Sequence, residues 1–104
     1  MRAVVELLVA GEYDVLERLT GRSRLSADDL RRRVGGYGRT LVRPPDHAYE
    51  HLEATDVERA SPPRVFVDFD LFTAEEGRSD LTLSLLVIQG EPEWSVVIND
   101  LRVQ

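Results

Sequence analysis

The chain has 104 residues, 42% of them hydrophobic and 31% charged, which is typical of a single folded globular domain. It contains no cysteine, which excludes disulfide bonds and thiolate metal sites. Its formal net charge is −6, and because an acidic surface repels phosphate, we do not expect nucleic acid as a partner. A basic protein would suit this charge.

No segment approaches the roughly 20 apolar residues that are needed to cross a bilayer, so no membrane partner is expected. Glu6 interrupts the short apolar run near the start of the chain, where a signal peptide would need an unbroken one. These features predict a cytoplasmic protein.

Residues 1–43 predict the helical half of this single domain. Apolar residues at helical spacing indicate short helices over 2–10 and 12–20, which end at Gly11 and Gly21. Ser26 with Asp29 three residues later approximates a capping box and starts a third helix that runs to about residue 39.

Residues 44–104 predict the mainly β half. Two prolines at 44 and 45 end the helical half, and Asp46 can cap one helical turn before a weak edge strand near 53–59. His47 and His51 match the H-x-x-E-H pattern of inverted zinc peptidases. A helix of barely two turns in so short a chain does not suit that fold, so we interpret them as surface histidines and expect no metal or other cofactor.

Three runs of alternating apolar and polar residues predict strands over 64–74, 78–89 and 93–104. Matching the all-apolar faces of the first two places Val65, Val67, Phe69 and Leu71 opposite Val87, Leu85, Leu83 and Leu81. This register leaves residues 75–77 as the first loop, with Gly77 in the left-handed conformation. A second loop over 90–93 places Leu86 opposite Val97. We therefore expect an α+β fold in which two to three N-terminal helices pack on one face of a curved, mainly antiparallel sheet of three to four strands.

The other face of this sheet is expected to carry Phe66, Leu86 and Val97 in one row. Asp68 and Asp70 lie beside it and are explained by hydroxyl-to-carboxylate pairs with Ser84 and Thr82. A solvent-facing sheet surface does not normally carry this many large apolar side chains, so a second copy of the chain is the expected cover, and a merely patchy outer face is the alternative. The predicted interface residues are Phe66, Phe72, Leu86, Ile88, Val97 and Leu101.

The order of three helices, a weak strand and a three-stranded antiparallel meander resembles the cone-shaped NTF2-like (SnoaL/cystatin-related) α+β domains. The stretch from Asp70 to Leu83, DLFTAEEGRSDLTL, and the tail from Trp94 to Leu101, WSVVINDL, resemble small uncharacterised actinobacterial proteins. This second resemblance implies no known activity, and a shared fold does not fix a function.

The NTF2-like resemblance implies an alternative function, since these domains include isomerases, dehydratases and epoxide hydrolases that use carboxylates and tyrosines inside the cone. Asp100 is the strand acid that could point inward, with Tyr13 and Tyr37 as helical partners. An acid in an apolar pocket has a raised pKa and can act as a general base. The competing interpretation is that Asp100 is solvated or caps a turn.

The leading hypothesis is a small, acidic, non-catalytic protein that acts through protein–protein contacts as a homodimer. One concrete form is an immunity or antitoxin-like protein that neutralises a basic partner. The alternative is a small-molecule pocket, binding or enzymatic, between helices and sheet.

Overall fold

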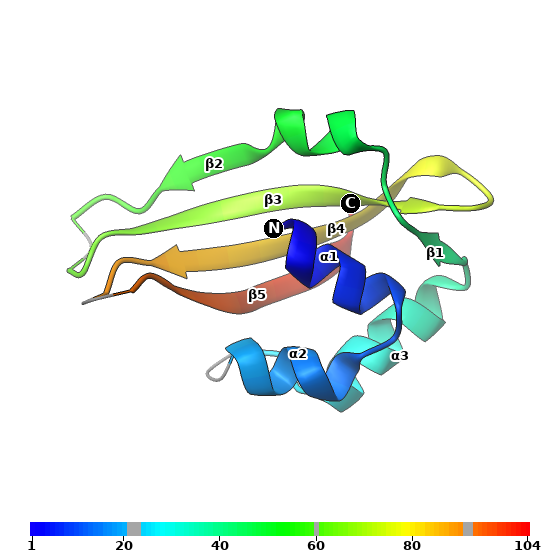
Figure 1. Ribbon diagram of the computed structural model, residues 1–104, viewed down its shortest axis with the longest axis horizontal. Helices are drawn as coiled ribbons and strands as arrows, with labels where there is room; N and C mark the ends of the chain where they lie inside the picture. Colours follow the sequence, from blue (N-terminus) through cyan, green and yellow to red (C-terminus); the bar gives the residue numbers. More distant parts are fainter. Residues whose placement is uncertain (21–23, 60, 91–92) are drawn as a thin grey trace.

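A computed structural model describes the whole chain except residues 21–23, 60 and 91–92, and the side chain of His51. Its described part contains three α-helices, one 3₁₀ helix and a five-stranded sheet (Figure 1). In chain order these are α1 (Arg2–Val9), α2 (Tyr13–Thr20), α3 (Ala27–Tyr37), β1 (Leu41–Val42), η1 (Asp46–His51), β2 (Glu53–Asp56), β3 (Arg64–Thr73), β4 (Gly77–Ile88) and β5 (Ser95–Val103). No described helix is long and apolar enough to cross a membrane.

The start of α3 is fixed by the predicted capping box. The Ser26 hydroxyl accepts a hydrogen bond from the Asp29 N–H at 3.1 Å, and the Ser26 N–H donates to the Asp29 carboxylate at 3.0 Å. The helix ends at Tyr37, two residues before the predicted end, because Gly38 adopts the left-handed conformation at φ 74°. The end of α2 that was predicted at Gly21 falls outside the described residues.

The sheet is antiparallel, with β3 and β4 at its centre and β5 beside β4. Both β1 and β2 pair with the opposite edge of β3, but at its two ends: β2 pairs with residues 65–68 and β1 with residues 72–73. The predicted weak strand corresponds to β2. Strand β1 was not predicted, and the sheet has five strands, whereas three to four were expected.

The predicted register between β3 and β4 is confirmed for Val65, Val67 and Phe69, which lie opposite Val87, Leu85 and Leu83. A β-bulge then shifts the pairing, so that Phe72 lies opposite Arg78 and Thr73 opposite Gly77. The loop is therefore residues 74–76 and not the predicted 75–77, and Leu71 does not lie opposite Leu81 as predicted. Gly77 is left-handed as predicted, at φ 74°.

The predicted register between β4 and β5 is confirmed at its start, where Leu86 lies opposite Val97. A second irregularity follows, and beyond it Ser84 lies opposite Asp100 and Leu83 opposite Leu101. This one-residue shift turns Leu101 to the helix-covered face, where it is 1% exposed, so its predicted place on the outer face was wrong. The predicted loop over 90–93 includes two residues outside the described part.

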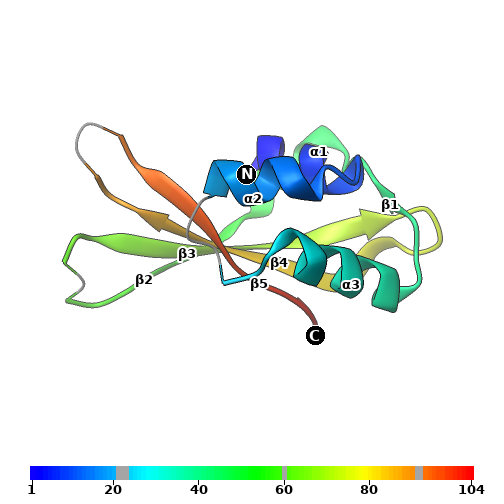
Figure 2. The same cartoon turned by 90° about the horizontal axis from the view of Figure 1, so that it is seen from below.

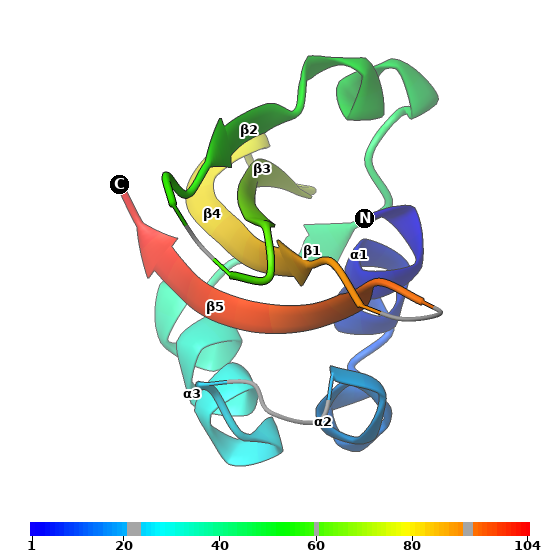
Figure 3. The same ribbon diagram turned by 90° about the vertical axis from the view of Figure 1, so that its left-hand side faces the viewer.

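The three helices lie on one side of the curved sheet (Figure 3), which confirms the predicted α+β class. Buried leucines of the helices meet buried side chains of β3, β4 and β5 to form the core. Its fully buried members are Val5, Leu8, Leu16, Leu30, Leu71, Leu81, Leu83, Leu85, Ile98 and Leu101.

The helices cover only part of the sheet. In Figure 1 the start of β3, the end of β4 and the start of β5 project to the left, beyond α2 and η1. Strands β3 and β4 stay paired to the tip of this end, where Arg64 lies opposite Ile88, and Figure 2 shows the strong twist of the sheet there. We call this part of the sheet, residues 64–67, 86–88 and 94–97, the projecting end.

Candidate protein-binding surface at the projecting end of the sheet

The outer face of the projecting end carries the predicted apolar row. Phe66 lies opposite Leu86, and Leu86 lies opposite Val97, so the three side chains cross three strands side by side. All three are half-buried. Ile88 continues the patch, between Arg64 and Ser95.

The helix-side face of the projecting end is apolar as well. It presents Val65 and Val67 on β3, Val87 on β4 and Val96 on β5, and each of these is half-buried because the helices do not reach far enough to cover them. The chain therefore exposes apolar side chains on both faces of the same end, which is uncommon for a sheet that faces only water.

A groove of about 950 Å³ lies along this end, at the side of β5. Leu86, Ile88 and Val97 line it from the sheet. Leu19 of α2 and Trp94 before β5 complete the apolar lining, and they are 71% and 54% exposed. Large exposed apolar side chains gathered in one place mark contact surfaces, and tryptophan contributes more than most residues to binding energy.

Two arginines, Arg24 and Arg64, also line the groove. Neither forms an ion pair with a described residue, and the Arg64 Nε–H donates to the Pro62 carbonyl at 3.3 Å. The groove therefore offers two arginines that no described carboxylate neutralises by an ion pair, on a protein whose formal net charge is −6. An occupant of this groove should present apolar side chains flanked by carboxylates.

Beyond this patch the outer face carries a polar network around Asp70. The Arg78 guanidinium donates twice to one Asp70 carboxylate oxygen, at 2.8 and 3.0 Å, and Thr82 donates to the other at 2.7 Å. Thr82 and Ser84 are 0% and 3% exposed. The predicted pairing of Asp70 with Thr82 is thus confirmed. The Asp68 carboxylate was predicted to pair with Ser84, but its Oδ2 lies 3.6 Å from the Arg102 guanidinium and its Oδ1 is buried with no hydrogen-bond partner among the described residues.

The structure does not bring the three candidate catalytic residues together. Asp100 pairs with Arg33 of α3 at 3.1 Å and with Arg102 at 3.8 Å. The register shift in β5 turned Asp100 outward and buried Leu101 in its place. The helix-covered face holds the close-packed core at the position where the cone of an NTF2-like enzyme would hold its acid.

The two tyrosines are engaged elsewhere. The Tyr37 hydroxyl donates to the Glu76 carboxylate at 2.8 Å, and burial, followed by this hydrogen bond, raises the Tyr37 pKa above its ordinary value. The Arg31 guanidinium lies 5.4 Å from the ring centroid of Tyr13. Each contact ties α3 to its neighbours, and none of them points to a reaction.

His47 is exposed and lies on η1. Among the described residues, no group of three or more His, Asp or Glu side chains is arranged to hold a metal ion. The His51 side chain, which the H-x-x-E-H pattern also requires, falls outside the described part.

Of the predicted interface residues, Phe66, Leu86, Ile88 and Val97 gather at the projecting end. Phe72 lies elsewhere, beside η1, and Leu101 lies in the core. The sequence interpretation missed the other residues that line the groove, among them Leu19, Arg24, Arg64 and Trp94. Trp94 had a usable signal, since it is the single tryptophan of the chain and stands where a strand begins.

The chain matches the model of a family described as a domain of unknown function (DUF7668) over residues 5–104, and it belongs to that family. No curated protein and no solved structure matches it.

Proposed function

We propose that this protein is a non-catalytic binding protein that acts through protein–protein contacts, and that a second copy of the chain occupies the projecting end of its sheet. The observation that carries the proposal is the apolar character of both faces at this end, together with the groove lined by Leu86, Val97 and Trp94. Closed two-fold dimers are the commonest soluble oligomers, and they need a surface that complements itself.

The charges at the projecting end support self-complementarity. Asp56 lies opposite Val65, and the Val57 N–H donates to the Arg64 carbonyl at 3.1 Å, so the acids Asp56 and Glu58 stand close to the Arg64 main chain. Both acids are exposed. In a two-fold dimer the acids of one copy can meet Arg24 and Arg64 of the other, while the apolar rows pack between them.

Sedimentation velocity at micromolar concentration tests the proposal. Wild type should sediment as a dimer. Phe66→Asp and Trp94→Asp should each raise the dimer dissociation constant by at least about tenfold, because each variant places an unpaired carboxylate in an apolar contact. Trp94 is 54% exposed, so its replacement should have little effect on the folding of the monomer. Loss of the dimer in this variant could therefore not be explained by unfolding.

The matched control is Ala74→Asp. Ala74 is exposed in the turn between β3 and β4, at the opposite end of the sheet, so this variant adds the same charge and should remain a dimer. A monomeric wild type at micromolar concentration would overturn the proposal. In that case a basic protein, as an antitoxin-like function would require, is the next partner to test, and the acidic net charge of the whole chain, not the arginine-lined groove, is the feature that favours it.

A further inference from the structure

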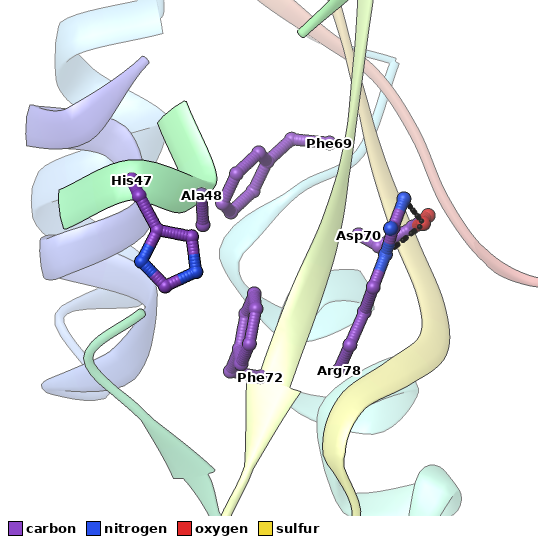
Figure 4. A pocket seen from close by; sticks show the side chains of 6 residues that line it. All are labelled: His47, Ala48, Phe69, Asp70, Phe72 and Arg78. Atoms are coloured by element: carbon purple, nitrogen blue, oxygen red, sulfur yellow. Dashed lines mark hydrogen bonds and ion pairs between the residues drawn. The ribbon is translucent and has the colours of Figure 1, made fainter. Parts of the chain in front are cut away.

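The outer edge of β3 is interrupted. Strand β2 pairs with β3 up to Asp68, and β1 pairs with it from Phe72 onward, so three residues, 69–71, have no strand partner on this side. Asp68 and Phe72 are four residues apart, which corresponds to a gap of about 13 Å along the strand. The 3₁₀ helix η1 lies beside this gap (Figure 4).

The hydrogen bonds on either side of the gap show which main-chain groups face it. The Val57 N–H donates to the Arg64 carbonyl at 3.1 Å, and the Ala74 N–H donates to the Thr40 carbonyl at 2.9 Å. Every second residue of an extended strand directs both its N–H and its C=O to the same edge. The residues of β3 that face this edge are therefore the even-numbered ones, and Asp70 is the one inside the gap. Among the described residues, none donates to or accepts from the Asp70 main chain on this side.

A pocket of about 380 Å³ opens at the same place, within the range of about 300–1,000 Å³ that small-molecule sites occupy. Phe69 and Phe72 line it from β3, and Ala48 and His47 line it from η1. Figure 4 shows these four side chains on one side of β3, with the Asp70 and Arg78 side chains on the other. The Phe69 ring is held in place by Tyr49, which stacks on it with centroids 5.0 Å apart.

The shape and the charge of the gap restrict what can bind. An extended peptide that ran along β3 would collide with β1 and β2, which occupy the edge on both sides. The Arg78 guanidinium is already neutralised by the Asp70 carboxylate, so the pocket offers no free charge for an anion. The remaining polar groups are one N–H and one C=O, side by side, next to aromatic walls.

We propose that the gap in the β3 edge binds a flat, uncharged aromatic lactam, a ring that carries an N–H and a C=O on adjacent atoms. The ring N–H donates to the Asp70 carbonyl, and the ring C=O accepts from the Asp70 N–H, as a partner strand would do. The aromatic part lies against Phe69 and Phe72. This site is separate from the projecting end and does not depend on dimer formation.

An NMR titration of the ¹⁵N-labelled full chain with 2-quinolinone tests this inference. We expect the largest amide shifts at Phe69, Asp70 and Leu71. N-methyl-2-quinolinone keeps the flat rings but lacks the N–H, so it should bind at least about tenfold more weakly, since the Asp70 carbonyl is then left without a donor. Both ligands are compared on the wild-type chain, so this arm does not depend on the folding of a variant.

A variant that fills the pocket provides the second arm. Ala48→Trp places a large ring in the pocket and should abolish the shifts, whereas Ala10→Trp, at an exposed position that does not line the pocket, should keep them. Three results would overturn the proposal: no shift of the three amides at millimolar 2-quinolinone, equal binding of the N-methyl compound, or unchanged binding by a folded Ala48→Trp variant.

Discussion

Leu83 on β4 lies directly opposite Leu101 on β5, and the two side chains are 0% and 1% exposed beneath the helices. The irregularity in β5 makes this pairing possible, because it turns Leu101 from the outer face to the core. The same shift that builds the core therefore turns Asp100 away from it, and Asp100 instead lines a polar pocket with Asp29 and Arg33 of α3. The register shift in β5 thus explains both the burial of Leu101 in the core and the position of Asp100 outside it.

Leu83→Ala should lower the free energy of unfolding by about 2–5 kcal/mol, since it removes buried methyl groups and leaves a cavity. Val103→Ala is the matched control, because Val103 is 58% exposed on the same sheet and should change stability by less than about 1 kcal/mol. Urea unfolding followed by circular dichroism measures both. Similar values for the two variants would contradict the assigned core.

Gly77→Ala should destabilise the protein by about 1 kcal/mol, because φ is 74° at this position and a Cβ is strained there. Gly36→Ala should act in the opposite direction and stabilise it by up to about 1 kcal/mol. Gly36 lies inside α3, and a Cβ built on it meets nothing within 4 Å. The two variants make the same chemical change, so opposite shifts in the urea midpoint identify the backbone as the cause. A Gly77→Ala variant as stable as wild type would contradict the left-handed conformation of Gly77 in this turn.

The parts of the fold that the sequence predicts well depend on local chemistry. Ser26 and Asp29 mark the start of α3 through hydrogen bonds within four residues of each other. The pairing of Val67 with Leu85 follows from a period of two on both strands, because a slip of one residue would expose a whole apolar face.

The parts that the sequence does not predict depend on distant contacts. In β5 the residues Val97, Asn99 and Leu101 continue an alternating pattern, so nothing local indicates the shift. The register is set by tertiary packing, because the shift places Leu101 opposite Leu83 in the core. Strand β1 has only two residues, too few for a periodicity. The groove takes Leu19 and Arg24 from outside the sheet, and no strand pattern could place them there.

The capping box makes the free energy of unfolding depend on pH in the acidic range. The Ser26 backbone N–H and then its hydroxyl hold the pKa of Asp29 below its ordinary value. A carboxyl whose pKa is lowered by folding contributes stability that is present above its unfolded pKa of about 3.9. That contribution is lost as the pH falls through the lower folded value. Asp29→Asn keeps the shape of the side chain but cannot titrate, so its unfolding free energy should fall less than that of wild type between pH 7 and pH about 3.

Urea unfolding at the two pH values measures this difference. Asp28→Asn is the matched control, since Asp28 is the neighbouring acid in the first turn of α3 and takes no part in the capping box. It should respond to acid as wild type does. If Asp29→Asn lost as much stability as wild type on acidification, the capping interaction would not be the source of the dependence.

Trp94 is the single tryptophan of the chain and is 54% exposed in the isolated subunit, so its fluorescence reports directly on cover at the projecting end. If a second copy covers this end, the emission maximum should move to shorter wavelength as the protein concentration rises through the dimer dissociation constant, because the indole leaves water. Phe66→Asp should keep the long-wavelength emission throughout the range, and Ala74→Asp should follow wild type. A dimer that forms by sedimentation without any change in Trp94 emission would place the contact on a different surface, and the proposed interface would then be wrong.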